Sequence, residues 1–258
     1  MSDDQARRVQ EQFGGSAAAY VTSPGHAAGD DLDTLVAWGR ALAPRRVLDV
    51  ATGGGHTALA FSRFTTSVIA VDLTLPMLRA ARDFTTAQAA GPIRFLGADA
   101  EALPFRAGAF GTVTCRIAAH HFPALLPVLR EVARVLRTGG SFLMQDILGH
   151  DDADAAAFIT EVERRRDPSH VRAFRQLEWT AFLRAAGLTV MDEAVMSRRR
   201  RWDDWTGRMR MTDEARADLE RFVLTAPARC RDAFEFSVEQ GRVVSFSDRM
   251  LLLRADRD

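Results

Sequence analysis

The chain has 258 residues, which is enough for one α/β domain with additions. Its 34 basic residues equal its 34 acidic residues, so the formal net charge is zero and gives no reason to expect nucleic acid or an anionic membrane as a partner. All of the basic residues are arginine. The absence of lysine excludes P-loop nucleotide binding, a pyridoxal Schiff base, the protein-kinase fold and the Tyr-x-x-x-Lys pair of short-chain dehydrogenases.

Cysteine usage and the amino terminus both indicate a cytoplasmic protein. Cys115 and Cys230 lie far apart, which fits a reducing compartment better than a disulfide framework. The first four residues are polar and acidic, unlike a signal peptide, and no apolar run is long enough to span a bilayer. We therefore expect a cytoplasmic chain without a membrane span, and a homodimer stays open as its assembly.

The first 40 residues are predicted to be mainly helical. A short helical turn is expected over 17–21 and an amphipathic helix over 30–42, and Pro24-Gly25 breaks the chain between them. This segment precedes the first strong strand signal, so we interpret it as a helical addition to the domain.

A strand, a glycine loop and a helix follow one another at 47–61. The apolar run 47–50 predicts a buried strand that carries Asp49, three glycines follow at 53–55, and 58–61 predicts the start of a helix. Glycine lets the backbone turn tightly and leaves no Cβ between the backbone and a ligand. In this arrangement an α/β sheet presents bare backbone to a nucleotide-like ligand.

The glycine loop also satisfies a dinucleotide fingerprint. Gly53, Gly55 and Ala58 match Gly-x-Gly-x-x-Ala. Asp72 ends the next apolar run, where an acidic residue can accept hydrogen bonds from both ribose hydroxyls. An NAD(P)-dependent oxidoreductase is therefore one interpretation, although it leaves Asp49 and the acidic residue after the third strand unexplained.

Further strands alternate with helices along the chain. Apolar runs predict strands over 68–71, 93–97, 110–115 and 141–147, and helices are expected over 76–90 and 125–136. Polar residues follow the strands: Asp72 the second, Asp99 the third and the pair His120-His121 the fourth. In an open α/β sheet, ligands bind outside the carboxyl ends of the strands, so these side chains are expected near a ligand site.

This ordered set of motifs, over roughly residues 13–148, resembles the class I S-adenosylmethionine-dependent methyltransferases. It is most similar to the branch with a methyltransferase type 11 domain, which includes the quinone-biosynthesis C-methyltransferases and many small-molecule methyltransferases. The resemblance implies an α/β fold with a doubly wound, Rossmann-like sheet of seven strands. It also implies the strand order 3-2-1-4-5-7-6, an antiparallel last strand, and helical amino-terminal and cap additions.

The resemblance also implies which residues bind S-adenosylmethionine. Asp49 and the glycine loop would hold its methionine part, Asp72 its ribose and Asp99 its adenine amino group. Ala51 stands where many members have glycine. Tyr20, the only tyrosine, lies in the segment that folds over the cofactor in this branch. The full set of expected cofactor-binding residues is Tyr20, Asp49, Ala51, Gly53, Gly55, Asp72, Leu73, Asp99, Ala100, Cys115 and Arg116.

The acceptor is expected to bind at the ends of the fourth and fifth strands. His120 and His121 are the candidates for a general base, since histidine titrates near neutral pH. Arg116, Arg166 and His170 are the candidates for binding the acceptor. Cationic and titratable groups here would suit an acceptor with a carboxylate, a phosphate or an ionisable hydroxyl.

The chain beyond the fifth strand is predicted to add helices and two more strands. The helices are expected over 152–166 and 169–186, a strand over 188–196, a mostly helical cap insertion over 202–223 and the last strand over 243–254. The two strands fit an antiparallel edge added to the parallel sheet.

The basic run from Arg198 to Arg201 follows the first of these strands. Alternate members of the run would point to opposite faces, and we interpret it as a solvated edge rather than a binding site. Trp202, Trp205, Met209 and Met211 are interpreted as packing inside the cap rather than lining a pocket. No cysteines, histidines and carboxylates cluster at metal-ligand spacing, so no metal site is expected.

These patterns together predict one methyltransferase domain over 1–258. Its parts would be an amino-terminal helical lid (1–43), a cofactor-binding core (44–148), and the substrate-side helices, cap insertion and final strands (149–258). The expected function is S-adenosylmethionine-dependent methylation of a small-molecule acceptor, with oxygen, nitrogen and carbon acceptors all open. The alternatives are an NAD(P)-dependent oxidoreductase and a non-catalytic S-adenosylmethionine-binding protein, because a fold alone does not establish turnover.

Overall fold

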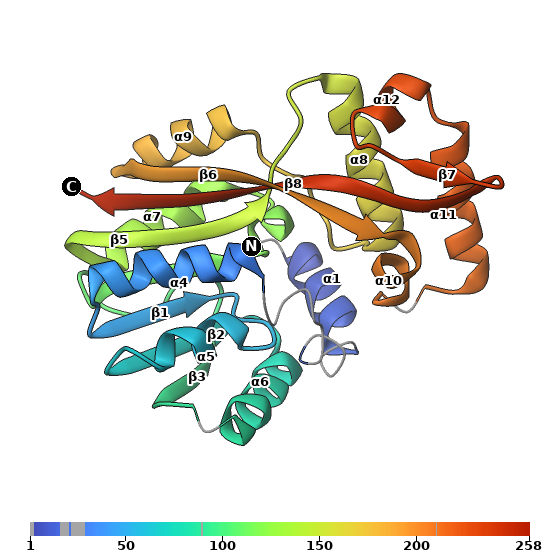
Figure 1. Cartoon of the computed structure of the whole chain (residues 1–258). Helices are drawn as coiled ribbons and strands as arrows, with labels where there is room; N and C mark the ends of the chain where they lie inside the picture. The colour runs from blue at the N-terminus through green and yellow to red at the C-terminus, as the bar shows by residue number, and fades with distance from the viewer. Residues whose placement is uncertain (1–2, 16–20, 22–28, 89, 210) are drawn as a thin grey trace.

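The computed structural model describes residues 3–15, 21, 29–88, 90–209 and 211–258 of the chain. These residues form one sheet of eight strands, which Figure 1 shows at the centre of the molecule. The strands are β1 (Arg46–Val50), β2 (Ser67–Asp72), β3 (Ile93–Gly97), β4 (Phe110–Arg116), β5 (Leu136–Ile147), β6 (Leu188–Arg201), β7 (Ser237–Glu239) and β8 (Arg242–Arg257).

The strand order along the sheet is β3-β2-β1-β4-β5-β8-β6, which confirms the predicted order with β8 as the last strand. β1 to β5 are parallel, and β8 runs antiparallel between β5 and β6. The short β7, which the sequence did not predict, pairs with β8. Because parallel strands end at one edge of a sheet, the loops after β1, β2, β4 and β5 gather there.

Helices cover both faces of the sheet (Figure 1). They are α4 (Asp30–Leu42), α5 (His56–Ser62) and α6 (Leu75–Ala87) on one face, and α7 (Leu125–Val135) and α9 (Gln176–Ala185) on the other. Successive residues of one strand therefore enter different cores: Val47 packs with α4 and α5, whereas Leu48 packs with α7 and α9. Burial on both faces explains why these strands are nearly continuous apolar runs.

A third hydrophobic core lies beyond the carboxyl ends of the parallel strands, on the right of Figure 1. We call this part the cap; it consists of β7, the far ends of β6 and β8, α8 (Ala153–Arg166), α10 (Trp202–Gly207), α11 (Asp213–Thr225) and α12 (Ala228–Asp232). As expected, Trp202 packs inside it. Trp205 packs there too, with its ring 4.9 Å from that of Phe246, but it also lines the cavity described below, so the expectation that it would not line a pocket was wrong.

β6 and β8 form a long two-stranded ribbon that joins the sheet to the cap. They pair from Leu188 opposite Arg257 to Arg201 opposite Ser245. Both strands are longer than predicted, because their pairing continues past the edge of the sheet and α10 and α11 pack against the extension. One continuous ribbon therefore carries residues of both sheet cores and of the cap core.

The largest difference from the predicted helices concerns the segment before α9. The helix predicted over 169–186 spans Gln176–Ala185 instead, and Glu178 fixes its start by accepting the Arg175 N–H at 3.0 Å. The residues before it form a loop, in which the Val171 N–H donates a hydrogen bond to the His120 carbonyl at 2.9 Å. This loop therefore lies against the end of β4, beside the strand-end histidines.

At the amino terminus, α1 (Asp3–Gly14) lies against α6. Helical structure was predicted for this region without bounds, whereas the helix predicted over 30–42 is confirmed by α4. The turn predicted over 17–21 lies outside the described residues except for Val21, and so does the Pro24-Gly25 break.

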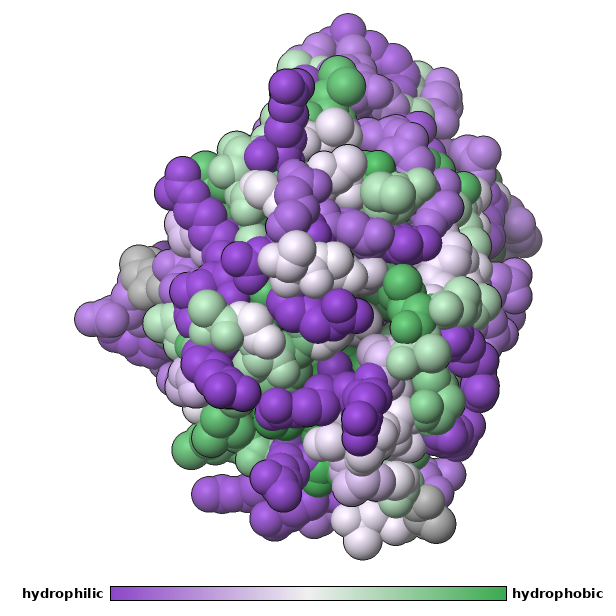
Figure 2. Space-filling model, turned by 90° about the vertical axis from the view of Figure 1, so that its left-hand side faces the viewer, coloured by the Kyte–Doolittle hydropathy of each residue, from purple (hydrophilic) through white to green (hydrophobic). Residues whose placement is uncertain are grey.

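Figure 2 shows the face at which the parallel strands begin, the left-hand side of Figure 1. Hydrophilic residues cover most of this face, and apolar residues lie between them in small groups. None of the described helices is long and apolar enough to cross a membrane.

Replacing Phe246 by alanine should lower the free energy of unfolding by about 3–5 kcal/mol, because it removes a fully buried ring that contacts Trp202, Trp205 and Phe236. Urea unfolding followed by circular dichroism would measure the change. Val244→Ala, on the same strand and 40% exposed, is the control and should cost about 0.5 kcal/mol or less. Equal stability of the two variants would contradict the packing of the cap.

Candidate active site

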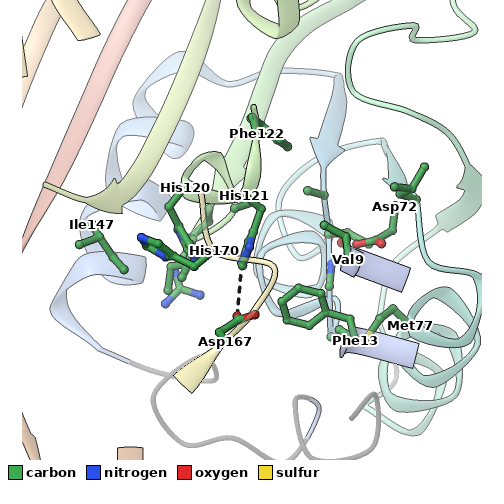
Figure 3. Close-up of a pocket in the computed structure, with 18 of the residues that line it drawn as sticks. Val9, Phe13, Asp72, Met77, His120, His121, Phe122, Ile147, Asp167 and His170 are labelled. Atoms are coloured by element: carbon green, nitrogen blue, oxygen red, sulfur yellow. Dashed lines mark hydrogen bonds and ion pairs between the residues drawn. The ribbon is translucent and has the colours of Figure 1, made fainter. Parts of the chain in front are cut away.

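A cavity of about 1340 Å³, partly open to solvent, lies at the carboxyl ends of the parallel strands. Figure 3 shows Asp72 on one side of it and Ile147 on the other, with His120, His121 and His170 between them. That volume includes space open to solvent. The cavity lies where the loops after β1, β2 and β4 meet α1 and the cap.

The loop after β1 adopts left-handed backbone conformations at three positions. The φ angles are 52° at Ala51, 53° at Gly53 and 82° at Gly55. Ala51 and Gly53 line the cavity, as expected of cofactor-binding residues, but Gly55 does not. A Cβ on Gly55 would lie 3.1 Å from the Ala81 Cβ in α6, so glycine at this position allows α6 to pack closely against the loop.

Asp49 is buried at the end of β1 and does not line the cavity. Its carboxylate accepts hydrogen bonds from the hydroxyls of Thr52 and Thr114, both at 2.6 Å. Burial raises the pKa of Asp49 to about 6. Asp49 thus braces the glycine loop through Thr52, and direct contact with the cofactor stays a prediction.

Asp72 ends β2 and lines the cavity, together with Leu73 and Ala100 from the expected set. Its Oδ2 accepts the Gly53 N–H at 2.9 Å, and its Oδ1 accepts the Thr74 N–H at 2.8 Å. Burial raises the pKa of this carboxyl group. Each carboxylate oxygen can accept a second hydrogen bond, so Asp72 can also receive donors from a ligand in the cavity.

Two more of the expected cofactor residues, Asp99 and Cys115, do not line the cavity. Asp99 accepts the Glu101 N–H at 2.9 Å, and its neighbours on both sides line the cavity although Asp99 does not. Cys115 is buried in the sheet core, where burial raises its pKa well above the usual value. Tyr20 lies outside the described residues.

His120 lies in a short 3₁₀ turn after β4 (η1, Ala119–His121) and lines the cavity. Its Nδ1 lies 2.6 Å from Oδ1 of Asp146, and its backbone N–H donates to Oδ2 of the same carboxylate at 3.0 Å. Burial lowers the pKa of His120, but the charge and hydrogen bond of Asp146 raise it by more, so the pKa lies above its ordinary value. The sequence analysis did not identify Asp146.

Two further imidazoles surround His120. The His120 ring centroid lies 4.1 Å from that of His121 and 5.3 Å from that of His170. Burial and the charge of His120 lower the pKa of His121 to about 4 and that of His170 well below its ordinary value. The dashed line in Figure 3 marks the 4.0 Å contact of His121 with Asp167. No metal-binding cluster of histidine, cysteine and carboxylate side chains occurs among the described residues.

Both arginines expected to bind the acceptor line the cavity, and both are already paired. Arg116 donates to Asp31 at 3.0 Å. Arg166 donates to Glu163 at 3.2 Å and to the Trp205 carbonyl at 3.0 Å. These contacts hold the two guanidinium groups in fixed positions in the cavity wall.

α1 closes one side of the cavity with residues that the sequence analysis did not single out. Val9 and Phe13 line the cavity, and the Phe13 ring meets the His121 ring edge-on at 5.1 Å. The buried Gln5 amide donates to the carbonyls of His121 and Ser169 at 3.1 and 2.7 Å. The spacing of four residues between Gln5, Val9 and Phe13 marks one helix face and could have indicated this role.

The run from Arg198 to Arg201 corrects the expectation of a solvated edge. Its alternate members do point to opposite faces, because Arg199 and Arg201 have side chains that are 49% and 83% exposed while Arg198 and Arg200 line the cavity. The prediction was wrong for Arg198 and Arg200, because the cap folds over their side of the ribbon.

Known proteins share both the motifs and the arrangement of this chain. A family model described as a methyltransferase domain matches residues 48–144. The uncharacterized methyltransferase YcgJ of Bacillus subtilis is 35% identical over 94% of this chain and 96% of its own. The chain belongs to the class I S-adenosylmethionine-dependent methyltransferases.

Solved structures agree with this family membership. A candidate methyltransferase of Bacillus halodurans has a TM-score of 0.85 and 37% identity to this methyltransferase, over 89% of this chain and 99% of its own. The YcgJ structure has a TM-score of 0.84 and 34% identity, over 88% and 97%. A ubiquinone biosynthesis O-methyltransferase of Ralstonia nicotianae is 30% identical over 67% of this chain and 73% of its own. Family membership implies S-adenosylmethionine as the methyl donor.

Gly55→Ala should destabilise the methyltransferase more than Gly139→Ala. Both glycines have φ angles in the left-handed region, which costs a residue with a Cβ about 1–3 kcal/mol. A Cβ at Gly139 meets nothing within 4 Å, whereas a Cβ at Gly55 presses on Ala81, so only Gly55→Ala also displaces α6 from the loop. Urea unfolding would compare the two. Equal losses of stability would contradict the packing of the loop against α6.

Proposed function

We propose that this methyltransferase acts on a small-molecule acceptor and that His120, oriented by Asp146, removes the acceptor's proton. The 2.6 Å contact between His120 Nδ1 and Asp146 Oδ1 carries the proposal. With Nδ1–H donated to the carboxylate, Nε2 of the neutral ring is an acceptor. An imidazole held in this way by a buried carboxylate has the geometry of a general base.

The shape of the site supports a small acceptor. The cavity is covered by α1 on one side and by cap residues on the other, and its lining comes from elements that are far apart in the sequence. Concave sites of this kind enclose small ligands. An acceptor of this size would lie beside the cofactor, between the strand-end histidines and the cap.

The β1–β2 side of the cavity fits the cofactor. Asp72 offers two carboxylate oxygens with spare lone pairs, which suits two ribose hydroxyls. The backbone at Ala51 and Gly53 borders the cavity without large side chains and suits the methionine part. When bound, S-adenosylmethionine supplies an electrophilic methyl group on a sulfonium.

The chain's own residues align the acceptor, exclude water and handle its proton. α1 and the cap enclose the two ligands, which favours a reactive alignment. Nε2 of His120 would receive the proton of an acceptor hydroxyl or amine as its oxygen or nitrogen bonds the methyl carbon, while the methyl–sulfur bond breaks and S-adenosylhomocysteine leaves. Asp146 then stabilises the resulting imidazolium.

The proposed division of the domain fits this scheme. The lid (1–43) contains α1 and α4, the cofactor-binding core (44–148) contains β1 to β5, and 149–258 contains the cap and the ribbon. Gln5 donates hydrogen bonds to the carbonyls of His121 and Ser169, which attach α1 to the two neighbouring loops and support the interpretation of this segment as a lid.

The comparisons favour neither alternative function. An NAD(P)-dependent oxidoreductase would share the glycine loop and Asp72, but the family relatives are methyltransferases. A non-catalytic S-adenosylmethionine-binding protein would need the cofactor side of the cavity alone. The oriented imidazole on the acceptor side supports an enzyme over such a protein.

Asp72→Ala should weaken binding of S-adenosylhomocysteine by about 1.5–3 kcal/mol, the scale of hydrogen bonds to a charged group. Titration calorimetry would measure the affinity. Asp83→Ala, on the exposed surface of α6, is the control and should bind like the wild type. Tight binding of NADH without binding of S-adenosylhomocysteine would overturn the cofactor assignment, and unchanged affinity in a folded Asp72 variant would remove Asp72 from the site.

Turnover should depend on the neutral form of His120. Protonation removes the base, so turnover with an acceptor found by screening should fall as the pH drops through the raised pKa of His120, above about 6.5. Asp146→Asn should move this transition to lower pH, since it removes the charge that raises the pKa.

His120→Ala should lower turnover by roughly 10²–10⁴ while the affinity for S-adenosylhomocysteine holds. His150→Ala is the control, because His150 lies outside the cavity. Wild-type turnover in the His120 variant would show that alignment alone carries the reaction.

A further inference from the structure

Three arginines converge on the acceptor side of the cavity. Arg198 and Arg200 come from the far end of β6, and Arg116 comes from the end of β4. Their side chains are 24%, 10% and 4% exposed, so all three are largely removed from bulk water. The electrostatic contacts of Arg198 include both Asp31 and Arg116, which places the three arginines in one cluster.

The carboxylates nearest to Arg198 are paired with its neighbours. Asp31 pairs with Arg116 at 3.0 Å, and Asp248 pairs with Arg200 at 2.6 Å. Asp248 also faces Arg198, at 3.8 Å. Among the described residues, Arg198 therefore has no carboxylate of its own at hydrogen-bond distance.

Arg198 is the member with the weakest compensation. Its Nε is buried without a hydrogen-bond partner, and the 3.8 Å separation from Asp248 is too long for a hydrogen bond. Burial, and then repulsion from Arg200, lower the pKa of Arg198 to about 10. A buried guanidinium N–H without a hydrogen-bond partner costs free energy unless an anion accepts from the group.

The same strand supplies an internal comparison. Arg199 and Arg201 have the same chemistry as their neighbours but point away from the cavity, and Arg201 is 83% exposed. A basic run that only made the ribbon edge soluble would not need two of its members inside the cavity. Arg198 and Arg200, which line the cavity, therefore favour a ligand of opposite charge.

We propose that Arg198, with Arg116 and Arg200 beside it, binds an anionic group of the methyl acceptor, a carboxylate or a phosphate. This inference rests on the proposed function. The anion would occupy the end of the cavity under the ribbon, and the rest of the acceptor would extend to His120, which lines the same cavity. Guanidinium groups suit this task, because they bind carboxylate and phosphate oxygens through paired N–H donors.

Binding of matched small probes tests the proposal. The protein saturated with S-adenosylhomocysteine would be titrated in a calorimeter with benzoate, phenyl phosphate and the neutral benzamide. At least one anion should bind ten times more tightly than benzamide, and its identity separates a carboxylate from a phosphate subsite. Equal affinity for all three probes, or binding of none, would overturn the proposal.

Substitutions at Arg198 and Arg201 of β6 test which arginine causes the preference for the anion. Arg198→Met should abolish the preference for the anion, whereas Arg201→Met, its outward-facing counterpart, should keep it. Arg198→Lys keeps the positive charge and should retain part of the preference, which guards against a loss caused by misfolding. An unchanged preference in a folded Arg198→Met protein would overturn the assignment.

The affinity for S-adenosylhomocysteine separates this inference from the proposed function. The wild type and all three variants should bind it equally, since Arg198 lies on the acceptor side. A wild type that binds S-adenosylhomocysteine but shows no preference for anions would refute the anion subsite alone. A wild type that fails to bind it would refute the cofactor assignment.

Discussion

The backbone pairing of β6 with β8 is the constraint on which both sides of the active site depend. β8 is hydrogen-bonded to β5 inside the sheet and to β6 along the whole ribbon. Leu251 and Leu252 lie in the two sheet cores, whereas Phe246, on the same strand, lies in the cap core. The cap is therefore attached through a continuous ladder rather than a linker. This pairing holds Arg198 and Arg200 of β6 at fixed positions relative to the ends of β4 and β5.

The contacts that form the two sides of the cavity differ in the sequence separation of their partners. On the cofactor side, the Gly53 N–H donates a hydrogen bond to Asp72. Gly53 follows β1, and Asp72 ends the neighbouring strand β2. On the acceptor side, Gln5 of α1 bonds the carbonyl of Ser169, and Arg200 bonds Asp248 across the ribbon. The cofactor side is thus formed by neighbouring strands and their loops, whereas the acceptor side depends on how distant segments meet.

That difference explains how far the sequence could be interpreted. The strands, the glycine loop and the position of Asp72 follow from local patterns, since apolar runs and glycines act within a few residues. The strand order was predicted only through the resemblance to the methyltransferase family. The role of Arg198 does not follow from a local pattern, because a basic run on a strand looks the same whether solvent or a cap covers its inner face. Asp49 shows a second limit: its position suggested a ligand contact, which stays a prediction, but did not show that its buried carboxylate accepts hydrogen bonds from Thr52 and Thr114.

Electrostatics distinguishes His120, the proposed base, from the two histidines beside it. The rings of His120, His121 and His170 are too close, and too buried, for more than one to carry a charge at low cost. Asp146 lies against His120 alone at hydrogen-bond distance, so the proton goes there. The pKa of His121 falls to about 4, partly because His120 is charged, and the pKa of His170 falls for the same reasons. The buried carboxylate of Asp146 thereby determines that His120 takes up the proton, while His121 and His170 line the same cavity as neutral imidazoles.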